Sequence, residues 1–500
     1  MNHALILPLL LPLFFGSGLL IAHRASPALK RWLSVLATWA LMPLAGWLLV
    51  LAGDDRIHVY VLGNWQPPFG IVLMLDRLGA LMLAVTSVLA SAAVLYASRG
   101  DDDRGPNFHA LFQFQLLGIN GAFLTGDLFN LFVFFEILLI ASYALLLHGQ
   151  GPGRARAGLH YVVLNLVGSS LFLIAAAILY GLTGTLNMAD LGVRVAAAEP
   201  SEAPLLAAAG FLLLVVFGLK AAILPLHLWL PRAYASATAP VAALFAIMTK
   251  VGLYAIVRVF SLVYGDAAGT LAGMIEAWLW PLAMLTLAFG VFGALAAKEL
   301  QLLMAHLVVV SVGTLLAGIA LGSEQGLSAA LYYLLHSTLI SGALFLLADL
   351  IVRQRGEVEG RLVVSPALRQ PLLLGAMFFF GAISVAGLPP LSGFLGKVML
   401  LRAVGPGEQA LALWPVVLIG GLGMVVALSR AGSLLFWRAT DEAPLRERAD
   451  GVRLLACVWL LAGSLVLVVA AQPIQAYVQA AAAQVHQLGP YFDIVRGGAR

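Results

Sequence analysis

The stretch of sequence that decides the fold covers residues 218–252 and reads GLKAAILPLHLWLPRAYASATAPVAALFAIMTKVG. Two lysines, Lys220 and Lys250, lie in it within long apolar runs, and a proline-interrupted segment with a histidine separates them. An ionised lysine at the centre of a membrane helix costs about 2.5–3.5 kcal/mol on insertion scales. Such a residue is rarely found there without a function, so this stretch indicates a membrane protein that handles ions.

Two further charges occur in similar surroundings. Lys397 follows a second proline break in GLPPLSGFLGK (387–397), and Glu136 lies within NLFVFFEILLIASYALLL (130–147). Each of these charges, taken alone, is also compatible with a side chain that reaches the headgroups from a helix end. Together, the glutamate and the three lysines in central apolar segments favour a route for ions.

The composition assigns the chain to the membrane. Of its 500 residues, 62% are hydrophobic and 10% are charged, whereas soluble domains carry about 25% charged residues. The first apolar stretch, Ala4–Ala22, lacks a basic segment before it and a clear cleavage signal, so it predicts a retained helix. The pI near 9.2 does not indicate nucleic-acid binding, because the basic residues fall in short loops.

Cofactor chemistry finds little support in the sequence. The single cysteine, Cys457, excludes disulfide bonds within the chain, iron–sulfur clusters and cysteine-based zinc sites. Neither a GxxxxGK[ST] motif nor a dinucleotide fingerprint occurs, which argues against direct use of nucleotides. We therefore expect no cofactor.

Apolar runs long enough to cross about 30 Å of hydrocarbon predict fourteen membrane helices in an all-α fold. They are expected at 4–22, 32–52, 71–97, 107–125, 128–148, 157–182, 204–230, 235–264, 270–296, 300–321, 326–353, 371–403, 410–437 and 452–471.

The distribution of basic residues supports this count. Odd-numbered loops hold 17 lysines and arginines, whereas even-numbered loops hold only Arg56, Arg194 and Arg402. A missed or invented helix would scramble the alternation. The positive-inside rule then predicts that the odd loops face the cytoplasm and that both termini lie on the outer side of a bacterial inner membrane.

Two predicted helices, 204–230 and 371–403, are too long for simple spans and carry proline near the middle, Pro225 in the first and Pro389 and Pro390 in the second. They are the seventh and twelfth helices in the count. The offset of five is an odd number, so the two helices cross the membrane in opposite directions, as an inverted repeat requires. Broken helices at matching places in inverted units are typical of transport sites.

Three histidines are weaker candidates. His336, in LYYLLHSTLISG, is able to titrate near neutral pH, although a packed and hydrogen-bonded histidine is an equally good interpretation. For His227, two residues after the first proline break, and for His306, capping or packing is the default interpretation.

Other charged groups predict structural roles. Asp76 and Arg77 are interpreted as a pair or an interfacial anchor, and Arg258 as a helix-end anchor. The acidic run 101–103 is expected to be a solvated turn, and Asp349 and Arg353 to form an i,i+4 pair.

Nearly the whole chain resembles the antiporter-like subunits shared by Mrp-type cation/proton antiporters and the respiratory NADH:quinone oxidoreductase. Three motifs carry the resemblance: GDLFNLFVFFEILLIASYALL (126–146), PLHLWLPRAYASATAPVAALFAIMTKVGLYAIVR (225–258) and GLPPLSGFLGKVMLL (387–401). The D-type subunit of the Mrp-type antiporters is favoured by Arg232 in LPRAY, where respiratory relatives usually read LPDAH, and by Lys397, where one respiratory paralogue commonly has glutamate. The opening of the third segment, LGNWQPPFGIVLMLDRL (62–78), also looks like the Mrp version.

The resemblance implies two inverted five-helix units. In this chain they correspond to 107–264 and 265–437, with N-terminal helices in 1–106 and a last helix and tail in 438–500.

It also implies a hydrated relay in which Glu136 pairs with Lys220, Lys250 is central, His336 bridges and Lys397 is terminal. Two departures bear on the route. Ser341 stands where several relatives have lysine, and His306 replaces a typical tyrosine.

These observations predict a non-enzymatic secondary transporter subunit that couples proton entry to outward movement of Na⁺ or K⁺. The chain has no carboxylate cluster for a dedicated cation site and no soluble domain, so we expect partner subunits in a hetero-oligomeric membrane complex. The alternatives are a proton-pumping subunit of an NADH- or hydrogen-linked redox complex, and a subunit that only scaffolds other membrane proteins.

Overall fold

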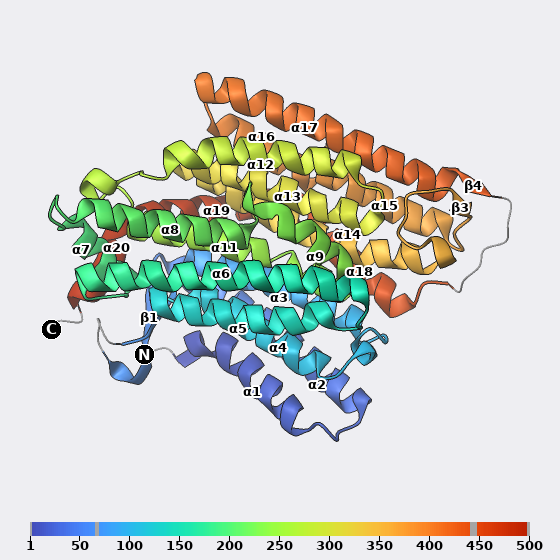
Figure 1. The fold of residues 1–500 in the computed structure, drawn as a ribbon, viewed down its shortest axis with the longest axis horizontal. Coiled ribbons are helices and arrows are strands. Elements are labelled where there is room, and N and C mark those ends of the chain that lie inside the picture. The colour runs from blue at the N-terminus through green and yellow to red at the C-terminus, as the bar shows by residue number, and fades with distance from the viewer. Residues whose placement is uncertain (1–2, 66–69, 441–447, 498–500) are drawn as a thin grey trace.

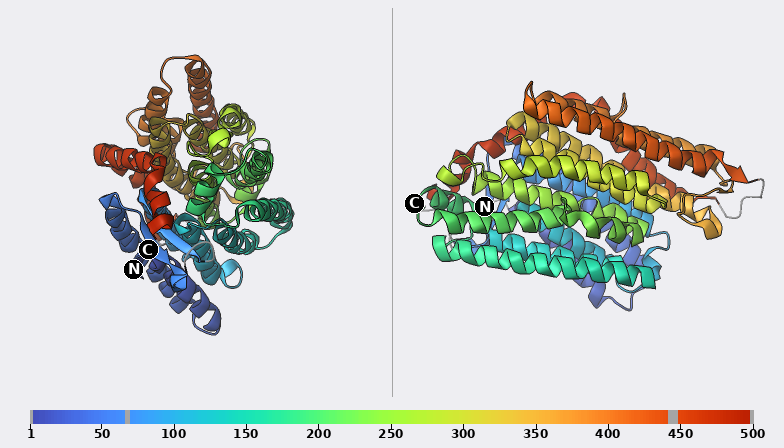
Figure 2. Two further views of the ribbon diagram at one scale, coloured as in Figure 1. Left: turned by 90° about the vertical axis from the view of Figure 1, so that its left-hand side faces the viewer. Right: turned by 45° about the horizontal axis from the view of Figure 1, so that its top comes forward.

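The computed structural model describes residues 3–65, 70–440 and 448–497. Arg446, Arg500 and residues 66–69 of the LGNWQPPFG segment therefore lie outside the described residues. Within these ranges the chain is a bundle of long helices that lie side by side along one direction (Figures 1 and 2). Its two short sheets lie at opposite ends of the bundle (Figure 1).

The α-helices are α1 (Leu7–Ile21), α2 (Pro27–Leu51), α3 (Arg77–Ala97), α4 (Phe108–Leu124), α5 (Leu128–Leu147), α6 (Pro152–Thr183), α7 (Met188–Ala196), α8 (Ala203–Ala221), α9 (Trp229–Ser236), α10 (Ala239–Phe245), α11 (Met248–Leu262), α12 (Glu276–Ala296), α13 (Leu300–Ala320), α14 (Glu324–Arg353), α15 (Pro371–Ala386), α16 (Ser392–Ala403), α17 (Glu408–Gly432), α18 (Gly451–Val469), α19 (Ala471–His486) and α20 (Leu488–Gly497).

Short elements connect them. The single-turn helices are η1 (His3–Ile6), η2 (Ala52–Asp54), η3 (Leu62–Asn64), η4 (Asp102–Arg104), η5 (Leu226–Leu228), η6 (Gly269–Leu271), η7 (Gly356–Val358) and η8 (Ser433–Trp437). Strand β1 (His58–Val61) pairs antiparallel with β2 (Val72–Leu75), and β3 (Ser365–Pro366) pairs in parallel with β4 (Ala439–Thr440).

Twelve of the fourteen predicted spans are helical segments long and apolar enough to cross a membrane. The other two are the 17-residue helix α4 and the pair α15 and α16, which a break divides. The all-α membrane fold is thus confirmed, while the exact number of crossings stays a prediction. Large apolar side chains face outward on the outer helices, for example Leu418 (57% exposed) and Ile419 (68% exposed) on α17, as contact with hydrocarbon requires.

The two ends of the bundle differ. One end holds Arg99, Arg353 and Arg453 in ion pairs, and we call it the arginine end. The other, the terminal end, carries β1, α7 and α20, and both chain termini lie there (Figure 1).

Acidic and polar caps set where several helices begin. The Asp76 carboxylate accepts a hydrogen bond from the Gly79 amide at 2.8 Å, and Asp127 accepts one from the Asn130 amide at 2.7 Å. Each cap satisfies an amide that the first helical turn leaves unpaired. Ser323 caps α14 in the same way.

Both predicted helix breaks are present and end alike. Helix α8 stops before Ala222, which has a left-handed φ of 60°, and α15 stops before Gly387, with a φ of 80°. In each, a further amide returns to the last turn, from Ile223 to the Gly218 carbonyl at 2.9 Å and from Leu388 to Ile383 at 3.1 Å. This closure satisfies carbonyls at the helix end. The predicted prolines, Pro225, Pro389 and Pro390, lie in the two breaks.

Helix α14 lies at the centre of the bundle. It packs against α3, α10, α13, α15, α16, α18 and α19, so its polar residues face protein on every side. Helices α10 and α11, which carry the second half of the 218–252 stretch, are also buried along nearly their whole length. Lys250 and His336 therefore lie on the most enclosed helices, and Lys220 and Lys397 on helices that adjoin the breaks, whereas Glu136 lies on α5 and is only partly buried.

Candidate functional site

The predicted Glu136–Lys220 pair is indirect in this structure. No ion pair joins these two described residues, although they lie within electrostatic range. Glu136, on α5, accepts a short hydrogen bond from the Ser169 hydroxyl, and the Lys220 ammonium donates to Asn165 Oδ1 at 3.1 Å. Asn165 and Ser169 are one turn apart on α6, so this helix bridges the two charges.

Lys220 lies at the end of α8, directly before the break, and is 6% exposed. Its ammonium is 5.9 Å from the centre of the Phe135 ring, a weak cation–π contact. Asn165 and Ser169 were missed by the sequence analysis. The signal was there: an asparagine within the apolar run YVVLNLVG has no low-cost position facing lipid.

Lys250 is completely buried in the first turn of α11. Its ammonium donates to the Ser311 hydroxyl on α13 at 3.3 Å, and Ser311 in turn donates to the Val308 carbonyl. No carboxylate among the described residues forms an ion pair with Lys250. A buried charge with one neutral partner is poorly stabilised, as a group that exchanges its proton requires.

His336, on α14, is 1% exposed and lies within electrostatic range of both Lys250 and Lys397. Its Nδ1 is 2.8 Å from the Ser392 hydroxyl. Its Nε2 has no partner among the residues that the structure describes. A buried nitrogen without a partner is unusual and marks a position for a transient one.

Lys397 lies on α16, and its ammonium donates to the Ala386 carbonyl at 2.6 Å, at the end of α15. A helix C-terminus carries partial negative charge, which favours an ammonium there. A methyl group at Gly387 would lie 2.7 Å from the Lys397 side chain, so this glycine provides room as well as its left-handed backbone.

His227 and His306 take no part in the hydrogen bonds that the structure gives for the three lysines. His227 is in η5 just after Pro225, and His306 on α13 packs so tightly against Gly293 that a methyl there would lie 2.1 Å from its Nδ1. The Nδ1 atoms of both histidines have no hydrogen-bond partner in the described part of the chain. Neither acts as a cap, and His306 is fixed by packing.

The structure corrects three structural interpretations. Arg258 is not a helix-end anchor: it is 2% exposed, and its guanidinium holds the Asp76 carboxylate with two bonds of 2.6 and 2.8 Å. Arg77 pairs with Asp55 instead of its neighbour. Burial alone would raise the pKa of Asp76, but Arg258 and a hydrogen bond from Tyr491 hold it below its usual value.

The acidic run at the arginine end is only partly solvated: Asp103 is exposed, but Asp101 and Asp102 are buried. Asp101 is 1% exposed and accepts from Arg353 at 2.8 Å and Arg453 at 3.1 Å. Asp102 accepts from Arg31 at 2.6 Å and His109 at 3.0 Å. Burial opposes its charge, but these bonds more than offset that effect and leave the pKa of Asp102 at about 2.

The predicted pair of Asp349 and Arg353 is confirmed at 2.5 Å. The ion pairs of Asp101 and Asp102 join α2, α14 and α18 to the connection between α3 and α4. The Asp349–Arg353 pair lies within α14 and holds the arginine in place. The acidic run was misread because its partners come from distant parts of the sequence.

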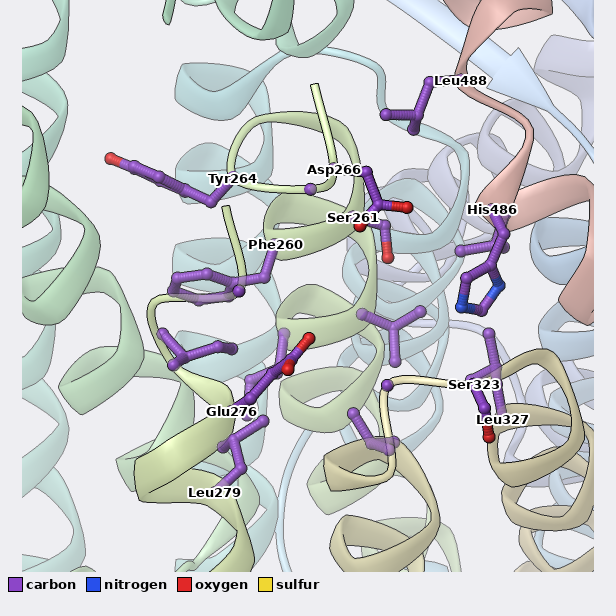
Figure 3. A pocket seen from close by; sticks show the side chains of 18 residues that line it. Phe260, Ser261, Tyr264, Asp266, Glu276, Leu279, Ser323, Leu327, His486 and Leu488 are labelled. Atoms are coloured by element: carbon purple, nitrogen blue, oxygen red, sulfur yellow. The ribbon is translucent and has the colours of Figure 1, made fainter. Parts of the chain in front are cut away.

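A cavity opens at the terminal end (Figure 3). It measures about 100 Å³ and is lined by Asp266, Glu276, Ser323 and His486 among others. A second cavity of about 20 Å³ shares Val257, Ile319 and Leu327 with the first.

The second cavity reaches Leu253 and Tyr254, one turn beyond Lys250. The residues that line the two cavities follow the chain from Asp266 back to Leu253, and Lys250 itself lines neither cavity.

A bundle of membrane-length helices that buries three lysines, with a partly buried glutamate near one of them and helix breaks beside two of them, defines an ion-translocating membrane protein. The chain belongs to the NADH:quinone oxidoreductase/Mrp antiporter transmembrane family, because the sequence model of that family matches residues 125–426. All three motifs that predicted the resemblance lie within this range, and the resemblance is confirmed.

Similar proteins are known across nearly the full length. The chain is 44% identical to the D subunit of a probable K(+)/H(+) antiporter of Rhizobium meliloti (strain 1021), over 96% of this chain and 95% of that one. It is 39% identical to the D subunit of the Na(+)/H(+) antiporter of Bacillus subtilis (strain 168), over 92% and 93%.

Among solved structures, it resembles a chain of the Mrp complex from Dietzia sp. DQ12-45-1b, with a TM-score of 0.88, 27% identity, and 99% and 100% of the two chains covered. A chain of the archaeal membrane-bound sulfane sulfur reductase gives 0.89 and 25%, over the same shares.

Proposed function

We propose that this chain is the D-type membrane subunit of a multisubunit Na⁺(K⁺)/H⁺ antiporter and carries protons through Glu136, Lys220, Lys250, His336 and Lys397. One observation carries the proposal. Each of the three lysines is buried, and its ammonium is held by a single neutral oxygen on another part of the fold. The full-length likeness to relatives named as K⁺/H⁺ and Na⁺/H⁺ antiporter subunits supplies the class of ion.

The geometry supports a coupling step at Lys220. Near Glu136 and Asn165 its charged form is stabilised. Because it lies directly before the break at Ala222, a change at the break moves the ammonium away from these partners into apolar surroundings. The free energy of the charged form then rises, and the proton leaves for Lys250. A cation or proton that arrives at Glu136 biases this movement, which couples the two fluxes.

The wider organisation of the chain fits the same function. The two inverted units are 107–264 and 265–437, each with one break. The arginine end faces the cytoplasm of a bacterial inner membrane, and the terminal end faces outward. The cavity at the terminal end is the proton entrance toward Lys250. The chain acts as a secondary transporter within a hetero-oligomeric complex and performs no enzymatic reaction.

Replacement of Lys250 by arginine tests the proposal. Arginine keeps the positive charge but does not release its proton at accessible pH. In vesicles from cells that express the whole operon, Lys250→Arg should assemble and lose cation-dependent proton flux. Lys298→Arg, in a loop, is the matched control and should keep it. An assembled Lys250→Arg complex with normal flux would contradict the relay.

A redox-driven proton pump is the second candidate, favoured by the likeness to the sulfane sulfur reductase chain. The two functions differ in their partners. Purification of the native complex should yield small apolar antiporter subunits and cation-dependent flux without an electron donor. Flavin or iron–sulfur proteins in stoichiometric amounts would instead support the redox complex.

A further inference from the structure

A chain of three serine hydroxyls continues from His336 across four helices. His336 Nδ1 is 2.8 Å from Ser392 Oγ on α16, and Ser392 Oγ is 2.6 Å from Ser464 Oγ on α18. Ser464 Oγ is in turn 2.8 Å from Ser384 Oγ on α15. All four side chains are buried, with exposed fractions between 0 and 2%.

Serine in a helix ordinarily donates its hydroxyl to a carbonyl of the preceding turn. Other buried serines of this chain do so, with bonds of 2.7–2.8 Å: Ser87, Ser91, Ser142 and Ser311. The hydroxyls of Ser384, Ser392 and Ser464 have no backbone acceptor among the described residues, and Ser392 does not cap α16. These three hydroxyls therefore bond to one another and to the histidine, which packing alone does not require.

We propose that His336, Ser392, Ser464 and Ser384 form a proton wire that carries the transported proton from the histidine to the break between α15 and α16. The inference rests on the proposed function, since it extends the same relay. At the far end of the wire, the Lys397 ammonium is held by the carbonyl of Ala386, two residues after Ser384. Lys397 is the base that the wire serves.

The transfer balances without any further reactant. A proton binds at His336 Nε2 and the proton on Nδ1 moves to Ser392 Oγ. The former hydroxyl proton of Ser392 passes to Ser464, and that of Ser464 passes to Ser384. The former hydroxyl proton of Ser384 leaves for the next base. At each oxygen one O–H bond forms and one breaks, so no charge remains in the wire.

One passage reverses every hydrogen bond. Before it, the imidazole donates through Nδ1; afterwards it is protonated on Nε2 and accepts from Ser392. The hydroxyls must rotate and the imidazole must change tautomer before the next proton passes. This reset lets the wire pass protons one at a time instead of acting as an open leak.

Two details of the structure fit this role. A methyl group at Gly393 would lie 2.8 Å from His336 Nε2, so the glycine lets the ring approach the start of α16. Ser464 lies outside residues 125–426, the part matched by the family's sequence model. The wire thus assigns a transport role to α18, beyond the matched region.

Serine variants test the wire in vesicles that contain the whole complex. S392A and S464A each remove one hydroxyl and should lower cation-dependent proton flux by about a hundredfold, the lower end of what a positioned proton-transfer group contributes. S464T keeps the hydroxyl and should keep most of the flux. S91A, equally buried but bonded to its own helix, is the matched control.

The outcomes separate this inference from the proposed function. Normal flux in an assembled S464A complex, with Lys250→Arg inactive, would overturn the wire and leave the relay intact. Normal flux in Lys250→Arg would overturn both. If S464A does not accumulate, S392A decides, because it removes the hydroxyl that lies between His336 and Ser464. Undiminished flux in an assembled S392A complex would then overturn the wire.

Discussion

Lys220 and Glu136 are held by residues of α6, and this changes how the pair is tested. Asn165 supplies the oxygen for the ammonium, and Ser169 donates to the carboxylate. Loss of either leaves a charge in the membrane interior with fewer partners. We therefore expect residues that present a single oxygen to one of the lysines to affect transport as well, although less than the charged residues do.

We expect Asn165→Ala to lower cation-dependent proton flux severalfold and to destabilise the complex by about 1–3 kcal/mol, the cost of leaving a buried polar group unpaired. Flux in vesicles and thermal unfolding of the purified complex measure the two effects. Ser170→Ala, on the exposed side of the same helix, should change neither. Unaltered flux in Asn165→Ala would show that Lys220 has no need of this oxygen.

At the scale of elements, the helix breaks and the helix caps position the site. Gly387 combines a left-handed backbone with the space that Lys397 occupies. Gly387→Ala should cost about 1–2 kcal/mol of backbone strain and should also displace the lysine, which abolishes flux. Gly405→Ala, with a φ of 61° and open space around it, should show only the strain. Equal flux in the two variants would contradict the role of the close contact.

Asp127, which caps α5, predicts an unusual dependence of stability on pH. Burial raises the pKa of Asp127 to about 6, although the amides of Asn130 and Phe129 oppose the shift. The folded state then binds this proton more strongly than the unfolded state, so the Asp127 contribution to stability falls as pH rises from 4 through 6. Asp127→Asn keeps an acceptor and should be more stable than wild type by about 1–3 kcal/mol at pH 7.

Thermal unfolding of the purified complex at pH 4 and pH 7 measures this difference, which should disappear at the lower pH. Asp450, the cap of α18, is the control of opposite sign. Burial raises its pKa, but Arg99 and the local amides more than offset this, so the pKa is lowered. Its contribution to stability is present at neutral pH and is lost as pH falls. A difference between Asp127→Asn and wild type that is constant with pH would exclude titration of the cap.

At the scale of the whole molecule, the Asp76–Arg258 ion pair joins α3, α11 and α20. Removal of one partner of a buried pair costs about 3–5 kcal/mol, because the other charge is left buried and alone. Asp76→Ala should therefore lower the unfolding temperature of the complex, whereas Asp266→Ala, an exposed carboxylate, should not. Unchanged stability of the complex with Asp76→Ala would contradict this stabilising role of the Asp76–Arg258 ion pair.

The sequence predicted the features that depend on local composition. Membrane-length apolar runs, proline breaks and charges in apolar surroundings are visible in the sequence itself, because burial away from water restricts which residues occur there. The fold class and the five relay candidates could therefore be predicted. Pairing over long sequence distances was not. Asp76 and Arg258 are 182 residues apart, and nothing near either residue indicates the other. The serines of the wire were missed for the same reason, because a serine inside a helix usually serves its own backbone.

The hydrogen bond from Tyr491 to Asp76 spans 415 residues and has a consequence for biosynthesis. A ribosome delivers the aspartate first, its arginine partner 182 residues later, and the tyrosine last of the three. Until the tyrosine has been made, the Asp76–Arg258 ion pair lacks this hydrogen bond, and α3 is not yet joined to α20. Docking of α20 is thus a later assembly step than the pairing of α3 with α11.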